Sequence, residues 1–264
     1  MNADLFAWLG ENVLVISLSA LRVSAAFVVL PLFTREGIPA LVRNAMFVSL
    51  ALISILIQPS ADFESFDTAT WLNLFAKEAF IGVVIGLFLG LFLWAFEAAG
   101  VVIDMQIGAS FALYFDPIVG NEVTLFGSFL SRWANYLFLA AGGLLLLAGA
   151  LIESFAIWPL VEPVTSLRML SLNLFESEFS RFMHLTLRIA GPIMVVVFVI
   201  DMSMGLINRY AQQFNVFFLS MSMKALAAVL MLIVLLPFLV NVLISEIDTR
   251  TRSVQPYLES ILLK

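Results

Sequence analysis

The chain has 264 residues, of which 62% are hydrophobic and only 12% are charged, and its formal net charge is −6. A soluble globular domain carries roughly 25% charged residues, so this chain lacks the polar side chains to cover a surface in water and is predicted to lie in the lipid bilayer. The absence of a basic cluster argues against nucleic acid as a partner, and the absence of cysteine excludes disulfides and thiolate metal sites.

Continuous apolar runs predict an all-α membrane protein of about six long hydrophobic helices, because a helix needs ~20 apolar residues to cross a bilayer. In chain order the expected spans cover residues 13–33, 44–57, 79–96, 133–152, 189–207 and 225–245. We expect them to form a single membrane domain over residues 1–264. The first span contains Arg22 and the fifth contains Asp201, two charges that lipid would penalise.

Three glycines, Gly82, Gly86 and Gly90, lie on one face of the third expected span in overlapping G-x-x-x-G units. This spacing lets the backbone of another helix approach closely. The neighbouring helix belongs either to the same chain or to a second subunit, and both alternatives remain open. In each case the stripe predicts a tightly packed seam.

The segment after the third span combines carboxylates with irregular apolar sequence. Glu97, Asp104 and Gly108 share one helical face, at spacings of seven and four residues. The helix is expected to end near Asp116-Pro117, because proline lacks an amide donor and restricts the residue before it. Irregular backbone at membrane depth is tolerated only inside protein or along an aqueous path. The segment therefore predicts a loop folded into a channel or, alternatively, an amphipathic connection at the membrane surface.

A methionine- and phenylalanine-rich segment, residues 208–224, joins the fifth and sixth expected spans. Methionine is unbranched and polarizable, so it can fill an irregular gap and repack. Such a segment could form a constriction that seals against ions yet yields to diverse polypeptides. Plain core packing is the other interpretation. The methionines in or beside it are Met202, Met204, Met221 and Met223.

Motifs for catalysis are missing from the sequence. A single histidine excludes two-histidine metal motifs, and no P-loop, G-x-S-x-G or dinucleotide fingerprint occurs. Asp104 and Asp201 could in principle form an intramembrane carboxylate pair that shares a proton. Alternatively, Asp201 pairs with Arg188, Arg209 or Arg22.

Two motifs resemble those of the FliR/SctT family. Residues 208–224, Asn-Arg-Tyr-Ala-Gln-Gln-Phe-Asn-Val-Phe-Phe-Leu-Ser-Met-Ser-Met-Lys, are similar to its signature, in which Ala-Pro-Gln-Leu-Asn-Val-Phe follows an Asn-Arg pair. The stretch Gly-Ala-Ser-Phe-Ala that begins at Gly108 and precedes Asp116-Pro117 is similar to the second motif, and a pattern of Arg22, Pro31, Pro39 and Arg43 agrees as well. Gln212 departs from the proline usual in relatives, which puts the local turn in doubt. The run from residue 217 to 224 is closer to injectisome SctT members than to flagellar FliR members.

The resemblance implies a non-enzymatic structural subunit of a type III secretion export gate, without cofactor or metal, in the bacterial inner membrane at the base of a secretion machine. The implied partners are FliP/SctR-like, FliQ/SctS-like, FlhB/SctU-like and FlhA/SctV-like membrane proteins, which assemble around a gated path for unfolded secreted proteins. A pore plug is carried over from relatives to Met105, Ile107, Gly108, Phe111, Leu113, Tyr114, Phe115, Asp116 and Pro117. A gate or gasket loop is expected at Asn208, Arg209, Phe214, Asn215, Phe217, Phe218, Met221, Met223 and Lys224.

Two other function classes compete with the channel subunit. A stand-alone proton-coupled transporter of small solutes would use Glu97, Asp104 and Asp201 as proton-linked groups, but the sequence shows no convincing internal repeat of the kind such transporters carry. An intramembrane hydrolase would depend on Asp104 and Asp201.

Overall fold

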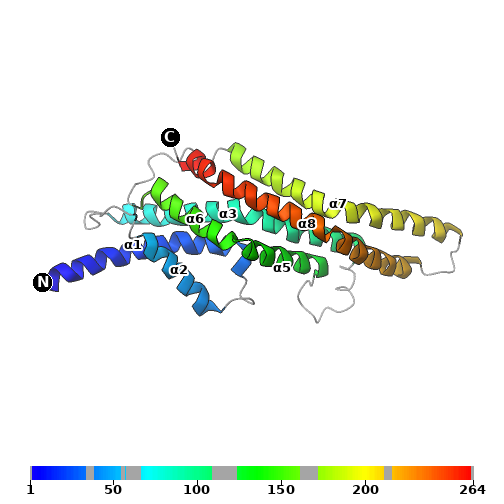
Figure 1. The fold of residues 1–264 in the computed structure, drawn as a ribbon, viewed down its shortest axis with the longest axis horizontal. Coiled ribbons are helices and arrows are strands. Elements are labelled where there is room, and N and C mark those ends of the chain that lie inside the picture. Colours follow the sequence, from blue (N-terminus) through cyan, green and yellow to red (C-terminus); the bar gives the residue numbers. More distant parts are fainter. Residues whose placement is uncertain are drawn as a thin grey trace. The chain divides into compact units, whose positions relative to one another are not determined.

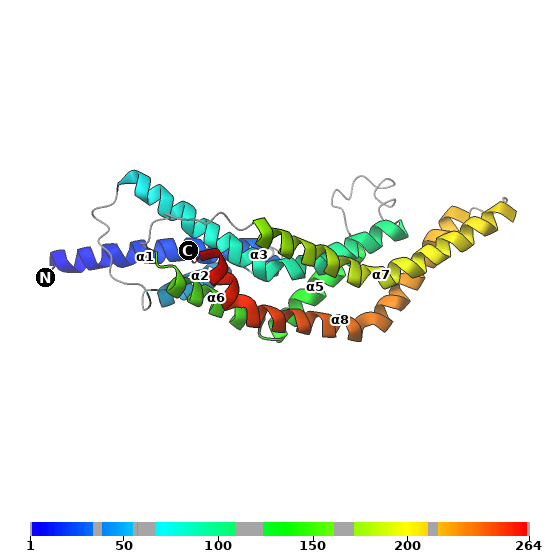
Figure 2. The same ribbon diagram turned by 90° about the horizontal axis from the view of Figure 1, so that it is seen from above.

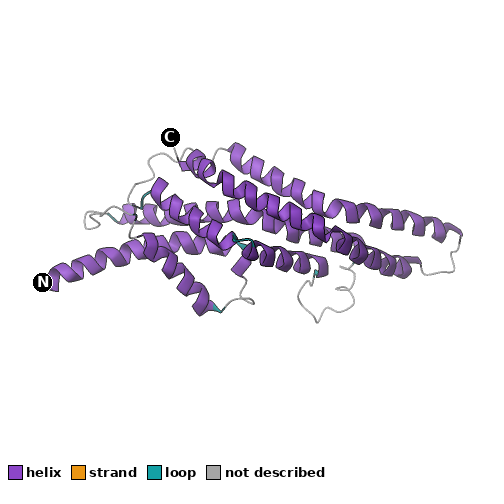
Figure 3. Cartoon of the chain, viewed as in Figure 1, coloured by secondary structure: helices purple, strands orange, loops and turns teal. Residues whose placement is uncertain are grey.

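All regular structure in the described part of the chain is helical, as Figure 3 shows. The computed structural model describes residues 2–33, 39–54, 57, 67–108, 124–160, 172–210 and 216–262. The expected all-α class is therefore confirmed. In chain order the elements are α1 (Asn2–Val29), the 3-10 turn η1 (Pro31–Phe33), α2 (Ala40–Ser54), α3 (Thr68–Ile107), α5 (Leu125–Ala140), α6 (Gly143–Ile157), α7 (Leu172–Tyr210) and α8 (Val216–Leu262) (Figure 1).

Fewer helices than the expected six are long and apolar enough to cross a membrane. Among the described residues, α3, α7 and α8 meet this condition, and the bent pair of α5 and α6 can count as a fourth span. The single span expected over residues 133–152 is wrong, since the helix breaks at Ala141 and Gly142. Gly142 has a φ of +85°, which continues no right-handed helix and suits glycine.

The helix α3 extends further than expected at its start and ends sooner. It runs for 40 residues and stops at Ile107, so the expectation that it continues to Asp116-Pro117 is wrong. The stop is Gly108, whose φ is +90° and whose N–H lies 3.2 Å from the carbonyl oxygens of both Asp104 and Met105. This is the left-handed glycine termination common at helix C-termini.

The chain divides into two compact units. The first unit comprises Met1–Leu91, Gly142–Glu178 and Asp248–Lys264, and the second comprises Phe92–Ala141 and Phe179–Ile247. A single domain over the whole chain stays a prediction.

In the first unit, α1 packs on α2, α2 packs on α6, and the first half of α3 packs on α1. A Cβ atom added at Gly82 would collide with the carbonyl oxygen of Arg22, and one added at Gly86 would lie 2.6 Å from that of Ala26. At these two positions the glycine stripe of α3 therefore packs against α1 of the same chain. Gly90, the third member of the stripe, is buried.

In the second unit, α7 and α8 run antiparallel and side by side (Figures 1 and 2). Their register is fixed by two ion pairs, because Asp201 near the end of α7 meets Lys224 near the start of α8, and Arg181 meets Glu246 further along. Both helices are longer than the expected spans.

Candidate functional site

The end of α3 and the start of α5 are joined by one carboxylate in the second unit. Asp104 Oδ1 accepts a hydrogen bond from the backbone N–H of Phe126 at 3.2 Å, and Oδ2 accepts one from Gly127 at 3.1 Å. These amides belong to the first turn of α5, which has no partner of its own along the helix. Thr124, the N-cap residue, forms no side-chain cap. Asp104 therefore caps α5 from another helix, and its charge is favourable at the positive end of the α5 dipole.

One ammonium group binds the opposite end of this junction. Lys224 Nζ lies 3.0 Å from Asp201 Oδ1 on α7 and donates to the carbonyl oxygen of Gln106 on α3 at 3.2 Å. The Gln106 carbonyl is in the last turn of α3, where no helical N–H remains to bind it. Ser220 also donates to Asp201 Oδ1, at 3.2 Å. Lys224 thus connects the end of α3 to both helices of the α7–α8 pair.

The contact between α3 and α5 is close along its length. A Cβ atom at Gly100 of α3 would collide with the backbone of Phe126, and one at Gly127 of α5 would lie 3.0 Å from Val101 Cγ2 on α3. Further from the junction, Ser131 donates to Glu97 Oε2 at 2.9 Å. Glu97 and Asp104 therefore both face α5, in agreement with the single helical face predicted for them.

Of the residues predicted for the pore plug, Met105, Ile107 and Gly108 lie in the described part of the chain. Met105 and Ile107 belong to the last turn of α3, where Met105 is exposed and Ile107 is buried. Gly108 is the residue that ends the helix. The others, Phe111, Leu113, Tyr114, Phe115, Asp116 and Pro117, lie outside the described residues.

The predicted gate residues lie mostly in helices. Asn208 and Arg209 are in the last turn of α7, whereas Phe217, Phe218, Met221, Met223 and Lys224 are in the first turns of α8. Phe214 and Asn215 lie outside the described residues, as does Gln212. The interpretation of the whole 208–224 segment as a loop is therefore wrong, because helical structure occupies both of its ends.

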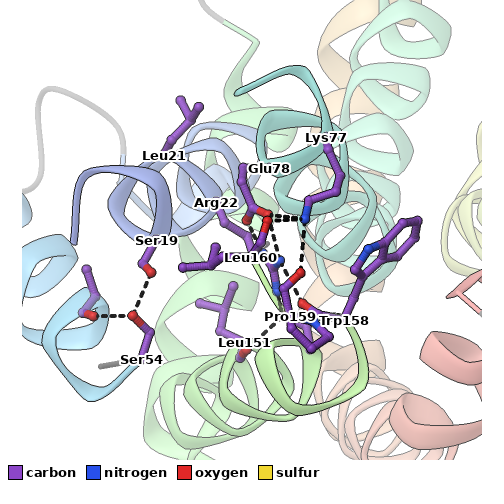
Figure 4. A network of polar contacts seen from close by, with 12 residues as sticks. Ser19, Leu21, Arg22, Ser54, Lys77, Glu78, Leu151, Trp158, Pro159 and Leu160 are labelled. Atoms are coloured by element: carbon purple, nitrogen blue, oxygen red, sulfur yellow. Dashed lines mark hydrogen bonds and ion pairs between the residues drawn. The ribbon is translucent and has the colours of Figure 1, made fainter. Parts of the chain in front are cut away.

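A second polar cluster lies fully buried in the first unit (Figure 4). Arg22 on α1 forms a bidentate ion pair with Glu78 on α3, at 2.6 and 3.0 Å, and donates to the carbonyl oxygen of Trp158 and to Ser154 Oγ, each at 3.1 Å. Lys77 lies 3.1 Å from Glu78 and donates to the carbonyl oxygens of Pro159 and Leu160. The cluster ties the chain leaving α6 to α1 and α3.

Large apolar side chains remain uncovered on α7 and α8. In an apolar stretch of 18 residues, only 22% of the residues in α7 and 28% of those in α8 are buried inside the chain, against 67% in α3. The exposed members include Val195, Phe198, Val199, Leu206, Leu226, Leu230, Ile233 and Val234. Exposing so long an apolar surface to water is energetically unfavourable, so lipid or other protein covers it.

A family model described as "Bacterial export proteins, family 1" matches residues 13–249 of the chain. The chain belongs to this family. The resemblance to FliR and SctT proteins is thereby confirmed.

Relatives of this bacterial export family occur among both secretion and flagellar proteins. The chain is 29% identical to the Yop proteins translocation protein T of Yersinia pestis, over 81% of this chain and 82% of that protein. It is 27% identical to the secretion system apparatus protein SsaT of Salmonella typhimurium, over 90% and 93%. It is 28% identical to the flagellar biosynthetic protein FliR of Bacillus subtilis, over 81% and 83%. The chain is therefore a membrane protein related to export-apparatus subunits.

In this export-family protein, Glu97, Asp104 and Asp201, the three carboxylates that a transporter would use, all have partners. Asp201 pairs with Lys224, so the expected partners Arg188, Arg209 and Arg22 are wrong. Asp104 binds backbone amides instead of sharing a proton with Asp201, and Glu97 binds Ser131. No group of three or more metal-binding side chains occurs in the described ranges.

Sequence reasoning missed the Lys77–Glu78 pair and the capping role of Asp104. Lys77 and Glu78 stand next to the expected start of the third span, where charges are ordinary. The capping role of Asp104 has a signal in the sequence, because the first turn of α5 contains no acidic residue. The structure adds that Thr124 forms no side-chain cap there.

Proposed function

We propose that the chain is a structural subunit of a type III secretion export gate, which forms a gated channel for unfolded secreted proteins together with FliP/SctR-like and FliQ/SctS-like subunits. The observation that carries the proposal is the apolar surface of α7 and α8, which the chain itself leaves mostly uncovered. Sister helices and lipid of the bacterial inner membrane cover this surface. FlhB/SctU-like and FlhA/SctV-like proteins are the further partners.

The gate in this proposal lies where α3 ends. Residues 105–122, which include Phe111, supply the pore plug, and the described residues on either side of segment 109–123 are Gly108 and Thr124. The neighbouring ends of α7 and α8 supply the gasket through Phe217, Phe218 and Met223, which are exposed. Aromatic and methionine side chains suit this task because they seal without fixed polar contacts and can repack around different polypeptides. The run from Phe217 to Lys224 favours an injectisome over a flagellum.

The chain acts without chemistry of its own in this proposal. Each of Glu97, Asp104 and Asp201 is engaged by groups that stabilise helix packing. A proton-coupled transporter would need such a carboxylate to be released and reprotonated during each cycle. The contacts therefore favour the channel subunit over the transporter.

Purification in mild detergent from cells that also express the FliP/SctR-like and FliQ/SctS-like proteins tests the proposal. We expect a hetero-oligomer that contains all three proteins and that keeps its composition through size-exclusion chromatography. Reconstitution of the chain alone should give no solute uptake above empty liposomes. A stable monomer that transports solute by itself would reject the proposal.

A further inference from the structure

The two helix ends that flank residues 109–123 carry side chains of opposite charge. The carbonyl end of α3 meets the Lys224 ammonium, and the amide end of α5 meets the Asp104 carboxylate. Each charge has the sign that the helix dipole at that end favours. The pairing is not local in sequence, because Asp104 lies 22 and 23 residues from the amides that it binds, and Lys224 lies 118 residues from Gln106.

Asp104 fixes the distance between the two flanking positions. Its two oxygens bind consecutive amides of α5, while its own backbone carbonyl accepts from Gly108, the residue that ends α3. A carboxylate that accepts two amide bonds holds both position and orientation. The close contact of Gly100 with the backbone of Phe126 and Gly127 leaves little room for α5 to move once Asp104 is bound.

Lys224 connects this fixed point to the α7–α8 pair. Its side chain is only 11% exposed, and its one ammonium is shared between the carboxylate of Asp201 and the carbonyl of Gln106. Moving α8 away from α3 would leave a mostly buried ammonium without one acceptor, which costs more than a neutral hydrogen bond. The ammonium therefore resists separation of α8 from the end of α3.

We propose that Asp104 and Lys224 are the positioning residues of the export gate: Asp104 clamps the two helix ends that flank segment 109–123, and Lys224 latches this clamp to the α7–α8 pair. This inference rests on the proposed function. Opening of the gate for a secreted polypeptide requires the Lys224–Gln106 contact to break while the Asp201–Lys224 pair keeps α7 and α8 together.

The clamp is tested by Asp104→Asn in the complete secretion system. The amide keeps the size of the side chain but turns an NH2 donor toward one of the two N–H donors of α5, so one bond is lost. We expect a roughly tenfold rise in ion leak across the inner membrane, with the subunit still copurifying with its partners. The matched control is Glu97→Gln on the same two helices, which retains an oxygen for Ser131 and should leave the leak unchanged. Equal leak in both variants, or no leak in Asp104→Asn, would overturn the clamp.

The latch is tested by three replacements involving Lys224. Lys224→Met should raise the leak, and Lys224→Arg should restore closure because a guanidinium can serve two acceptors. The exchange Asp201→Lys with Lys224→Asp restores the ion pair between α7 and α8, but it presents a carboxylate to the Gln106 carbonyl. We therefore expect the exchange to assemble normally and still leak. A tight exchange variant would show that the contact with α3 plays no part and would overturn the latch.

Deleting residues 109–114 separates this inference from the proposed function. If the deletion leaks while Asp104→Asn and Lys224→Met stay tight, the plug stands and the positioning role is wrong. If the deletion stays tight as well, the plug assignment itself is wrong.

Discussion

At the residue scale, the buried charges of the Arg22 cluster pair with one another and with nearby carbonyl oxygens. Arg22 and Lys77 are two cations that share one carboxylate, Glu78. The remaining donors bind Ser154 Oγ and the carbonyl oxygens of residues 158–160, which follow the last residue of α6. The guanidinium of Arg22 also lies 4.3 Å from the centre of the Phe155 ring, which adds a cation–π contact. Removing one partner of an ion pair that is this deeply buried strongly destabilises the fold.

Replacing Glu78 with leucine should therefore destabilise the protein more than replacing Arg22 with leucine. Glu78→Leu leaves the guanidinium of Arg22 and the ammonium of Lys77 buried without a carboxylate, and we expect a loss of about 3–5 kcal/mol in the free energy of unfolding. Arg22→Leu leaves Glu78 paired with Lys77 and should cost less. Thermal unfolding of the purified protein in detergent measures both.

Arg252→Leu is the control for this comparison, because Arg252 is exposed on α8 and its loss should change stability by less than about 0.5 kcal/mol. An Arg22→Leu variant as unstable as Glu78→Leu would contradict the pairing of Glu78 with Lys77.

Sequence alone could point to Arg22 but not to its neighbours. A charge inside an apolar run is visible in one dimension, and its need for a partner follows from the cost of burial. The partner, however, lies 56 residues away, and the carbonyl of Trp158 lies 136 residues away. Charge pairs between helices depend on which helices become neighbours, and the sequence has no periodicity that states this. Asp201 shows the same limit, since its partner is a lysine on α8 and not one of the three arginines expected from the sequence.

At the element scale, glycines determine which helices can approach most closely. The repeated spacing of Gly82 and Gly86 predicted a seam, and the structure shows α1 against it. The second seam, between α3 and α5, depends on Gly100 and Gly127, which are single glycines on different helices. A repeat can be recognised within one helix, whereas a contact made from isolated glycines on two helices cannot.

Gly86→Ala should destabilise the α1–α3 seam. The added methyl would lie 2.6 Å from the Ala26 carbonyl oxygen and 2.9 Å from the Val29 Cβ, so the two helices must move apart. We expect a loss of roughly 1–3 kcal/mol, typical of overpacking. The apparent melting temperature of the purified chain in detergent reports the change.

Gly149→Ala on α6 provides the matched control, because nothing lies within 4 Å of an added Cβ there. Alanine favours the helix and should stabilise the chain by about 0.4–1 kcal/mol. A seam variant as stable as this control would show that α1 and α3 do not pack as described.

At the scale of the whole molecule, composition predicted the surroundings better than the number of spans. The scarcity of charge required a surface covered by lipid or protein, and the exposed apolar faces of α7 and α8 agree with that. Among the described residues the number of spans falls short of six, because α2 and the described part of α1 from Val13 on are shorter than a span and the fourth expected span is broken. Residues 133–152 are continuous in hydropathy and yet contain the break at Gly142.

Single cysteines can map what covers these faces, since the natural chain contains none. Val234 is 71% exposed on α8, and Val234→Cys should react with a maleimide in the detergent-purified chain but become protected in the assembled complex. Leu239 is 1% exposed, and Leu239→Cys should stay unreactive in both preparations. Mass spectrometry of the labelled protein gives the extent of reaction. Persistent labelling of Val234→Cys in the complex would mean that no sister subunit covers this part of α8.

The break between α5 and α6 bears on how the chain enters the bilayer. The two helices have 16 and 15 residues, and each falls short of the ~20 needed for one helix to cross the hydrocarbon core. Neither helix is long enough for a translocon to release it into the bilayer as a separate segment. Biogenesis of this region therefore depends on joint insertion of the two helices, together with their neighbours.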